Sequence, residues 1–317
     1  MPVNLDKPHR WKEDVATSVD MYNQWFINFA PKAFRETRIQ AIKDVEATLR
    51  STSNLTDIRP ETIKRKPGIL PTLRMSTCPP IAVDRLIGLA DVTKSLVNRI
   101  EKEKKLPVKL RGDALDKELT KIGNLIEKMA DPDIFVWKGR DYPATETEIH
   151  RAATIVADRL CGSVANPIIR NAQEKRQLMG VARWLEAKGY SALSNNFKGS
   201  FQDMPAGTYS FRMNVPVGGK RAINMPIDAV IMPLESSQSE LPLLIEAKSA
   251  GDFTNTNKRR KEEAQKVHQL RSTYGGEVRF ILFLCGYFDS GYLGYEAAEG
   301  IDWVWEHRID DLGEFGL

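Results

Sequence analysis

The sequence predicts a mixed α/β fold, with a helical N-terminal region followed by a central β-sheet flanked by helices. Apolar residues recur at spacings of three and four through the first half of the chain, which is typical of helices packed on a core. Strand-like segments fill the second half, and a charged helical segment interrupts them. We therefore expect two parts, a helical region over 1–165 and a sheet-containing region over 166–317.

The first predicted helix carries apolar residues at helical spacing from Trp11 to Phe29. We expect Pro31 to end it, because proline has no amide hydrogen to donate to the carbonyl four residues earlier. Residues 50–80 are rich in proline, threonine and serine, which predicts a long loop or linker.

Helical spacing returns over 81–104 and again over 115–129. Another helix is expected to start at Thr145, because Thr145 and Glu148 have the spacing of a capping box. The next helix is expected from Asn171, which would cap it, to Gly189, which would close it.

Strands dominate the rest of the chain. Residues 208–217 and 220–233 flank Gly218-Gly219, a hairpin signal. Residues 241–247 form a short apolar run of the kind that is buried on both sides of a sheet. A charged helix is expected over 257–273, followed by the most apolar strand of the chain at 278–288.

Composition excludes several classes of protein. The chain is 42% hydrophobic and 28% charged, as in ordinary globular proteins, and no apolar run approaches the roughly 18 residues of a membrane span. The polar N-terminus is no signal peptide, so we expect a cytoplasmic protein without membrane contact. Three scattered cysteines favour neither a disulfide framework nor a zinc site. The net charge of +4 permits nucleic-acid binding without requiring it.

The residues that point to chemistry lie between 226 and 251. Asp228 falls in one predicted strand, while Glu246 and Lys248 lie two apart near the end of the next strand. Side chains two apart on a strand share a face, so the Glu246 carboxylate and the Lys248 ammonium project from the same face of an otherwise apolar strand. If the strand of Asp228 is adjacent, two carboxylates and a lysine meet at one point. The alternative is a polar strand edge with a surface ion pair.

Such a group suits phosphodiester hydrolysis. Two carboxylates hold Mg²⁺, and the carbonyl of Ala247 is a further candidate ligand. The ion would neutralise charge at the phosphate and acidify the attacking water. A lysine beside it would orient or deprotonate that water, or stabilise the charged transition state.

The pattern Asp228, then Glu246-Ala247-Lys248, resembles the PD-(D/E)xK nucleases, whose core is a mixed sheet flanked by helices. Pro226 departs from that pattern, since it stands two residues before Asp228. The segments KPHRWKEDVATSVDMYNQWF and LIEAKSAGDFTNTNKRRKEEAQK resemble type II restriction endonucleases of the XamI type. This resemblance implies Mg²⁺-dependent cleavage of double-stranded DNA at a palindromic site, GTCGAC, by a homodimer. We then expect the helical region, 1–165, to clamp the DNA and help to recognise its sequence, and the region 166–317 to be the nuclease domain that makes the cut.

The resemblance also implies a role for Glu174. In many nucleases of that superfamily, a glutamate on the helix before the sheet joins the metal site, and Glu174 is the matching candidate here. The alternative is that Glu174 is the N3 acid of a helix capped by Asn171.

Polar and basic residues after Lys248 are candidates for DNA contact, because they combine hydrogen-bond donors with cations at the expected start of a helix. They are Ser249, Asn255, Asn257, Lys258, Arg259, Arg260 and Lys261. Any of these side chains is also consistent with a solvated surface.

Two other functions remain open. The same core would serve a recombination exonuclease or a junction resolvase. A non-catalytic DNA-binding regulator would also bind DNA, although the complete set of Asp228, Glu246 and Lys248 argues against it.

Overall fold

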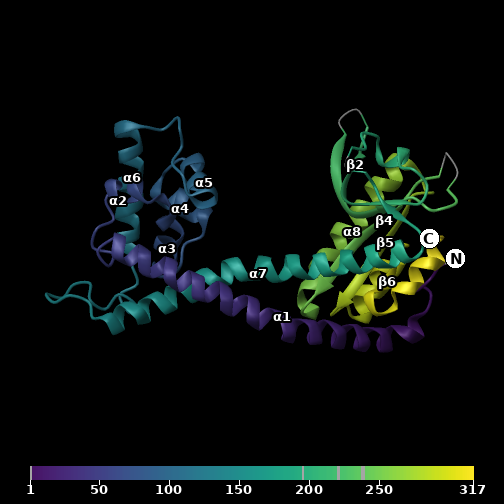
Figure 1. Ribbon diagram of the computed structural model, residues 1–317, viewed down its shortest axis with the longest axis horizontal. Helices are drawn as coiled ribbons and strands as arrows, with labels where there is room; N and C mark the ends of the chain where they lie inside the picture. The colour runs from purple at the N-terminus through teal and green to yellow at the C-terminus, as the bar shows by residue number, and fades with distance from the viewer. Residues whose placement is uncertain (1, 195, 220–221, 237–239) are drawn as a thin grey trace. The chain divides into compact units, whose positions relative to one another are not determined.

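The computed structural model describes residues 2–194, 196–219, 222–236 and 240–317, and of residues 255 and 257–259 it describes the backbone alone (Figure 1). The chain forms two compact units. The sheet unit combines the residues up to Phe29 with Arg170–Leu317, and the helical unit is Ala30–Ile169. Two long helices, α1 (Pro8–Ser51) and α7 (Glu146–Ala187), run through both units.

The sheet unit contains a six-stranded mixed sheet in the order β1 to β6. The strands are β1 (Ser191–Ala192), β2 (Thr208–Val217), β3 (Ile223–Ile231), β4 (Leu243–Ala250), β5 (Arg279–Gly286) and β6 (Asp302–Trp305). Strand β3 is antiparallel to both β2 and β4, whereas β4, β5 and β6 are parallel to one another, and β1 is parallel to β2. The predicted mixed α/β fold is confirmed.

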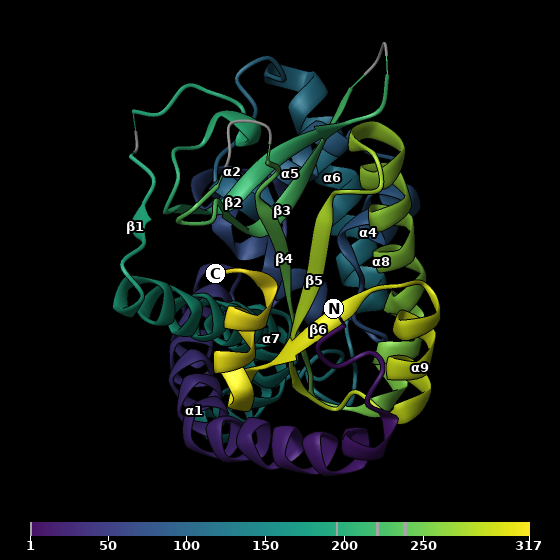
Figure 2. The same ribbon diagram turned by 90° about the vertical axis from the view of Figure 1, so that its right-hand side faces the viewer.

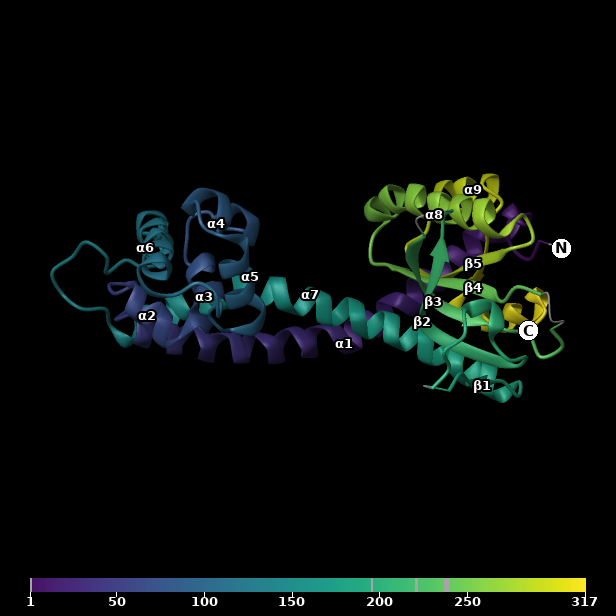
Figure 3. The same ribbon diagram turned by 90° about the horizontal axis from the view of Figure 1, so that it is seen from above.

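Helices cover both faces of this sheet. Helices α8 (Phe253–Tyr274) and α9 (Ser290–Ala298) lie together on one face (Figures 2 and 3). Val267 and Leu270 of α8 belong to the same core cluster as Leu244 of β4. The C-terminal part of α7 and the 3₁₀ segment η3 (Glu306–Phe315) cover the other face, where Val181 clusters with Ile245. Alternate residues of β4 therefore face α8 and α7.

The N-terminal residues complete the sheet unit. The amides of Val3 and Asn4 donate to the carboxylate of Asp302, at 2.6 and 3.0 Å. The Ser18 hydroxyl of α1 accepts from the amide of Gly286 at 2.8 Å. Gly286 has a φ of +100°, and a Cβ there would lie 2.1 Å from the carbonyl oxygen of Ala250, so only glycine fits.

The helical unit is built from short helices packed on the inner parts of α1 and α7. They are α2 (Pro60–Arg65), η1 (Pro67–Ile69), α3 (Leu70–Met75), α4 (Val83–Ala90), α5 (Lys94–Glu103) and α6 (Gly112–Met129). The predicted loop over 50–80 is therefore wrong. Three of its prolines, Pro60, Pro67 and Pro71, stand in the first turn of α2, η1 and α3, where a missing amide hydrogen costs nothing. Ile63 and Leu70 are fully buried.

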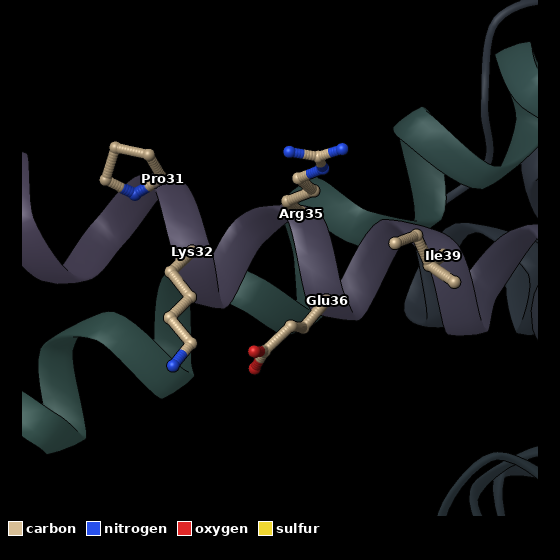
Figure 4. A pocket seen from close by; sticks show the side chains of 5 residues that line it. All are labelled: Pro31, Lys32, Arg35, Glu36 and Ile39. Atoms are coloured by element: carbon tan, nitrogen blue, oxygen red, sulfur yellow. The ribbon is translucent and has the colours of Figure 1, made fainter.

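Two predicted helix boundaries are also wrong. Helix α1 continues through Pro31 (Figure 4), and α7 passes Pro167 and Asn171 without a break. A long helix packed along its length tolerates the one backbone hydrogen bond that each proline removes. The predicted capping box at the start of α7 is confirmed, since the Thr145 amide donates to Glu148 Oε2 at 2.8 Å and the Glu148 amide to Thr145 Oγ1 at 3.3 Å.

Elements near the C-terminus, α9, β6 and η3, were not predicted from the sequence pattern. Within the described ranges, no helix is long and apolar enough to cross a membrane.

Candidate active site

Strands β3 and β4 separate where the first candidate carboxylate lies. Their pairing runs from Ile231 opposite Leu243 to Ala229 opposite Ile245 and stops there. Continued pairing would place Ala247 opposite Ile227. Instead, the Ala247 amide donates to Asp228 Oδ2 at 2.9 Å. The Asp228 side chain thus takes the place of a backbone acceptor.

Glu246 and Lys248 share the face of β4 that looks toward α8, as predicted from their spacing. Lys248 Nζ donates to Glu246 Oε1 at 3.0 Å. The two side chains are only 17% and 8% exposed, so this is a mostly buried ion pair rather than the surface pair that the sequence left open.

Helix α8 adds two charged side chains, Lys266 and Glu263, which lie in the expected charged helix over 257–273 but were not predicted as site residues. Lys266 Nζ lies 2.6 Å from Glu246 Oε1, and Lys248 Nζ lies 2.8 Å from Glu263 Oε1. Glu263 is fully buried. Its spacing of four from Val267 and seven from Leu270 puts it on the apolar stripe of α8, and that signal was available in the sequence.

The surroundings shift the proton affinities of Asp228 and Lys248. Burial raises the pKa of Asp228 to about 6, the charge of Glu246 adds to this, and the Ala247 amide opposes it. Burial lowers the pKa of Lys248, but the charges of Glu246 and Glu263 outweigh burial and leave that pKa above its ordinary value. Lys248 is therefore an ammonium ion at neutral pH, which favours an electrostatic role over that of a base.

Glu174 lies on α7, and its Oε1 accepts from Arg212 Nη2 at 2.7 Å and from Arg212 Nε at 3.1 Å. Its charge contributes to the raised pKa of Asp228. Because α7 does not begin at Asn171, the interpretation of Glu174 as a helix-capping acid is wrong. Arg212 interrupts β2 with a φ of +54° at the position opposite Asp228.

The candidate DNA contacts lie in β4 and in α8: Ser249 belongs to the strand, Asn255 falls in the first turn of the helix, and the basic run comes after that turn. Helix α8 begins at Phe253, so its free amides precede the basic run, and the argument from a helix N-terminus does not apply. Ser249 is half-buried, Lys261 is exposed, and the Arg260 guanidinium lies 4.8 Å from the Tyr295 ring centre. The side chains of Asn255, Asn257, Lys258 and Arg259 lie outside the described residues.

The donor set fits a hard cation. Asp228 and Glu246 offer carboxylate oxygens, and Glu246 Oε2 is buried without a hydrogen-bond partner among the described residues. The Ala247 carbonyl points to the same side as its amide, into the gap beside β3. Over the described part of the chain, no group of three or more histidine, cysteine or acidic side chains is placed to hold a metal ion. Two carboxylates, one carbonyl and waters are nevertheless a common Mg²⁺ environment.

A shallow pocket lies elsewhere, along the part of α1 that belongs to the helical unit. Pro31, Lys32, Arg35, Glu36 and Ile39 line it (Figure 4). It contains none of the candidate catalytic residues.

Comparison with known proteins identifies the class. Residues 53–305 match the model of the XamI restriction endonuclease family, and the chain belongs to this family. The predicted enzyme class, a type II site-specific endonuclease, is thereby confirmed. The type II restriction enzyme SalI of Streptomyces albus G is 54% identical over 314 residues, which cover 99% of each chain.

One solved structure, the crystal structure of protein VC1899 from Vibrio cholerae, aligns with 86% of this chain and 55% of its own length. Its TM-score of 0.30 and sequence identity of 14% are too low to inform either fold or function.

Proposed function

We propose that Asp228, Glu246 and Lys248 form the active site at which this restriction endonuclease hydrolyses double-stranded DNA. The observation that carries the proposal is the separation of β3 from β4, with Asp228 and Glu246 beside the gap and Lys248 paired to Glu246. Asp228, Glu246 and the Ala247 carbonyl would hold Mg²⁺. When bound, the ion would neutralise charge on the scissile phosphate and acidify the attacking water.

The residues of the chain would then divide the remaining work. The Lys248 ammonium would stabilise the negative charge that grows on the phosphate in the transition state. Glu174 lies close enough to act on Asp228, and we propose that it joins the metal site through a water or through its oxygen Oε2.

We further propose that the target is the palindrome GTCGAC and that a homodimer cleaves it with one active site for each strand. The DNA backbone would be contacted by Ser249 and by the basic residues Lys258, Arg259, Arg260 and Lys261. The helical region would clamp the duplex. The family membership and the relation to SalI support this proposal.

Plasmid digestion tests the site. Asp228→Asn and Glu246→Gln should each abolish cleavage with Mg²⁺ while DNA binding persists. Each substitution removes a negative charge that would bind the metal ion and leaves the core packing unchanged. Glu262→Gln makes the same change on an exposed residue of α8 and should cut normally. Cleavage by either site variant at the wild-type rate would refute the assignment.

The same digestion tests the mode of cleavage. A plasmid that carries one GTCGAC site should give one linear product, and sedimentation of the protein should show a dimer. Degradation from free ends would instead indicate an exonuclease, and binding without cleavage in Mg²⁺ or Mn²⁺ would indicate a regulator.

A further inference from the structure

Glu263 is a buried carboxylate that core stability does not explain. It is fully inaccessible to solvent, its Oε1 faces Lys248 Nζ at 2.8 Å, and its Oε2 has no hydrogen-bond partner within the described ranges. A buried charge with so few partners costs more than an apolar side chain at the same place. Val267 and Leu270, on the same stripe of α8, are apolar.

The contacts of Lys248 show what Glu263 supplies. The other carboxylate partner of Lys248 is Glu246, which is a proposed metal ligand. Glu246 Oε1 also forms an ion pair with Lys266 Nζ at 2.6 Å. A cation on Glu246 would weaken the hold of that carboxylate on Lys248. Glu263 belongs to α8 rather than to β4, so its position does not depend on Glu246.

We propose that Glu263 is the positioning residue of Lys248, holding its ammonium group in place when Glu246 binds the metal. This inference rests on the proposed function of Lys248. Glu263 touches neither substrate nor metal in this scheme, and it acts on the reaction only through the lysine.

The test is a double-mutant cycle on the full-length protein with Lys248→Ala and Glu263→Gln, measured by single-turnover cleavage at saturating Mg²⁺. In the wild-type background, Glu263→Gln should slow cleavage at least tenfold and leave DNA affinity, measured with Ca²⁺, within about threefold. In the Lys248→Ala background it should cause no further loss, because the residue through which it acts is gone. Glu262→Gln is the matched control on α8, and its cleavage rate should not change.

Urea unfolding without metal gives a second readout. In the wild-type background, Glu263→Gln should lower the unfolding midpoint, because Lys248 loses a partner. In the Lys248→Ala background it should raise the midpoint, because it removes a buried carboxylate that has no cation. Glu263→Met, which replaces the carboxylate with an apolar side chain of similar length, repeats both measurements with a different substitution.

Two outcomes overturn the inference alone. One is wild-type cleavage by Glu263→Gln, and the other is an equal loss in both backgrounds, which would mean that Glu263 acts independently of Lys248. If Lys248→Ala itself cuts at the wild-type rate, the proposed function of Lys248 fails first.

Discussion

At the scale of single residues, the candidate site is a set of charges that nearly balance. The site contains three carboxylates, from Asp228, Glu246 and Glu263, and two ammonium groups, from Lys248 and Lys266. When all five are ionised they leave one net negative charge. A divalent cation would turn this into one net positive charge, which suits an anionic phosphate.

Lys248→Ala tests whether this lysine takes part in the chemistry. We expect single-turnover cleavage to fall by about 10²–10³ while DNA binding and the Mg²⁺ requirement persist, because one transition-state contact is lost. Lys248→Arg should not restore the rate, since a guanidinium is planar and bulkier than an ammonium. A variant that binds DNA and cuts within about threefold of wild type would remove Lys248 from the mechanism.

The raised pKa of buried Glu296 predicts that the stability of the folded protein depends on pH. Burial, followed by the charge of Glu263, raises the pKa of Glu296 from 4.5 to about 8. The folded protein therefore keeps a proton that the unfolded chain has lost, so stability falls as pH rises from about 4.5 to about 8. The variant Glu296→Gln should not lose this stability, because glutamine does not ionise.

Urea unfolding at pH 5 and at pH 8.5 measures the effect. The stability of Glu296→Gln relative to wild type should rise between the two values, on the order of a few kcal/mol. An equal difference at both pH values would show that Glu296 ionises normally in the folded protein.

The sequence predicted part of this residue set. Asp228, Glu246 and Lys248 were found because strand alternation places polar residues on one face of an apolar run. Glu263 and Lys266 were missed because a charge on a charged helix looks solvated unless its helical phase is compared with that of Val267 and Leu270. The pairing of Arg212 with Glu174 joins β2 to α7, and no local pattern announces it.

At the scale of elements, α8 brings a competing cation to a proposed metal ligand. The Lys266 ammonium lies 2.6 Å from Glu246 Oε1. A metal ion must therefore either share the Glu246 carboxylate with Lys266 or displace the Lys266 ammonium from it. We expect Lys266→Met to tighten Ca²⁺ binding in the absence of DNA by about tenfold, since it removes a nearby like charge.

Calorimetric titration of Ca²⁺ checks this, with Lys12→Met as the control because Lys12 is an exposed residue of α1. An unchanged Ca²⁺ affinity in Lys266→Met would mean that Lys266 does not oppose the metal.

Elements were predicted well where periodicity is strong and poorly where proline was taken as a stop. Strands β2, β4 and β5 lie close to their predicted ranges. Pro60 and Pro67 begin helical turns, where a missing amide hydrogen costs nothing. Pro31 is carried inside α1 because tertiary packing outweighs a local cost of about 3 kcal/mol. Strand β6 was missed because its four residues, Asp302–Trp305, are too few to show a period.

At the scale of the whole molecule, both helices that pass from one unit to the other carry a proline within two residues of the boundary. The boundaries fall after Phe29 and after Ile169, and the prolines are Pro31 and Pro167. Each proline removes one backbone hydrogen bond from its helix close to the boundary.

We expect Pro31→Ala and Pro167→Ala each to stabilise the protein by about 1 kcal/mol. Alanine restores the hydrogen bond and fits a helix better, while the greater freedom of the unfolded alanine chain, together with the packing that already accommodates each proline, offsets part of the gain. Urea unfolding of the two variants, with Pro205→Ala as a control outside the helices, measures this. Loss of stability in both variants would mean that the surrounding packing depends on the proline rings.

The sheet unit is assembled from the two ends of the chain, and this has a consequence for biosynthesis. The Trp11 ring lies 5.5 Å from the Trp303 ring, and Asp14 pairs with Arg308 at 2.9 Å. A ribosome adds about 5–20 residues per second, so Trp11 and Asp14 wait on the order of tens of seconds for their partners to be made. The helical unit, Ala30–Ile169, is complete long before then. Because β4 and β5 also come late, a nascent chain would hold no assembled candidate active site until Gly286, at the end of β5, had left the ribosome.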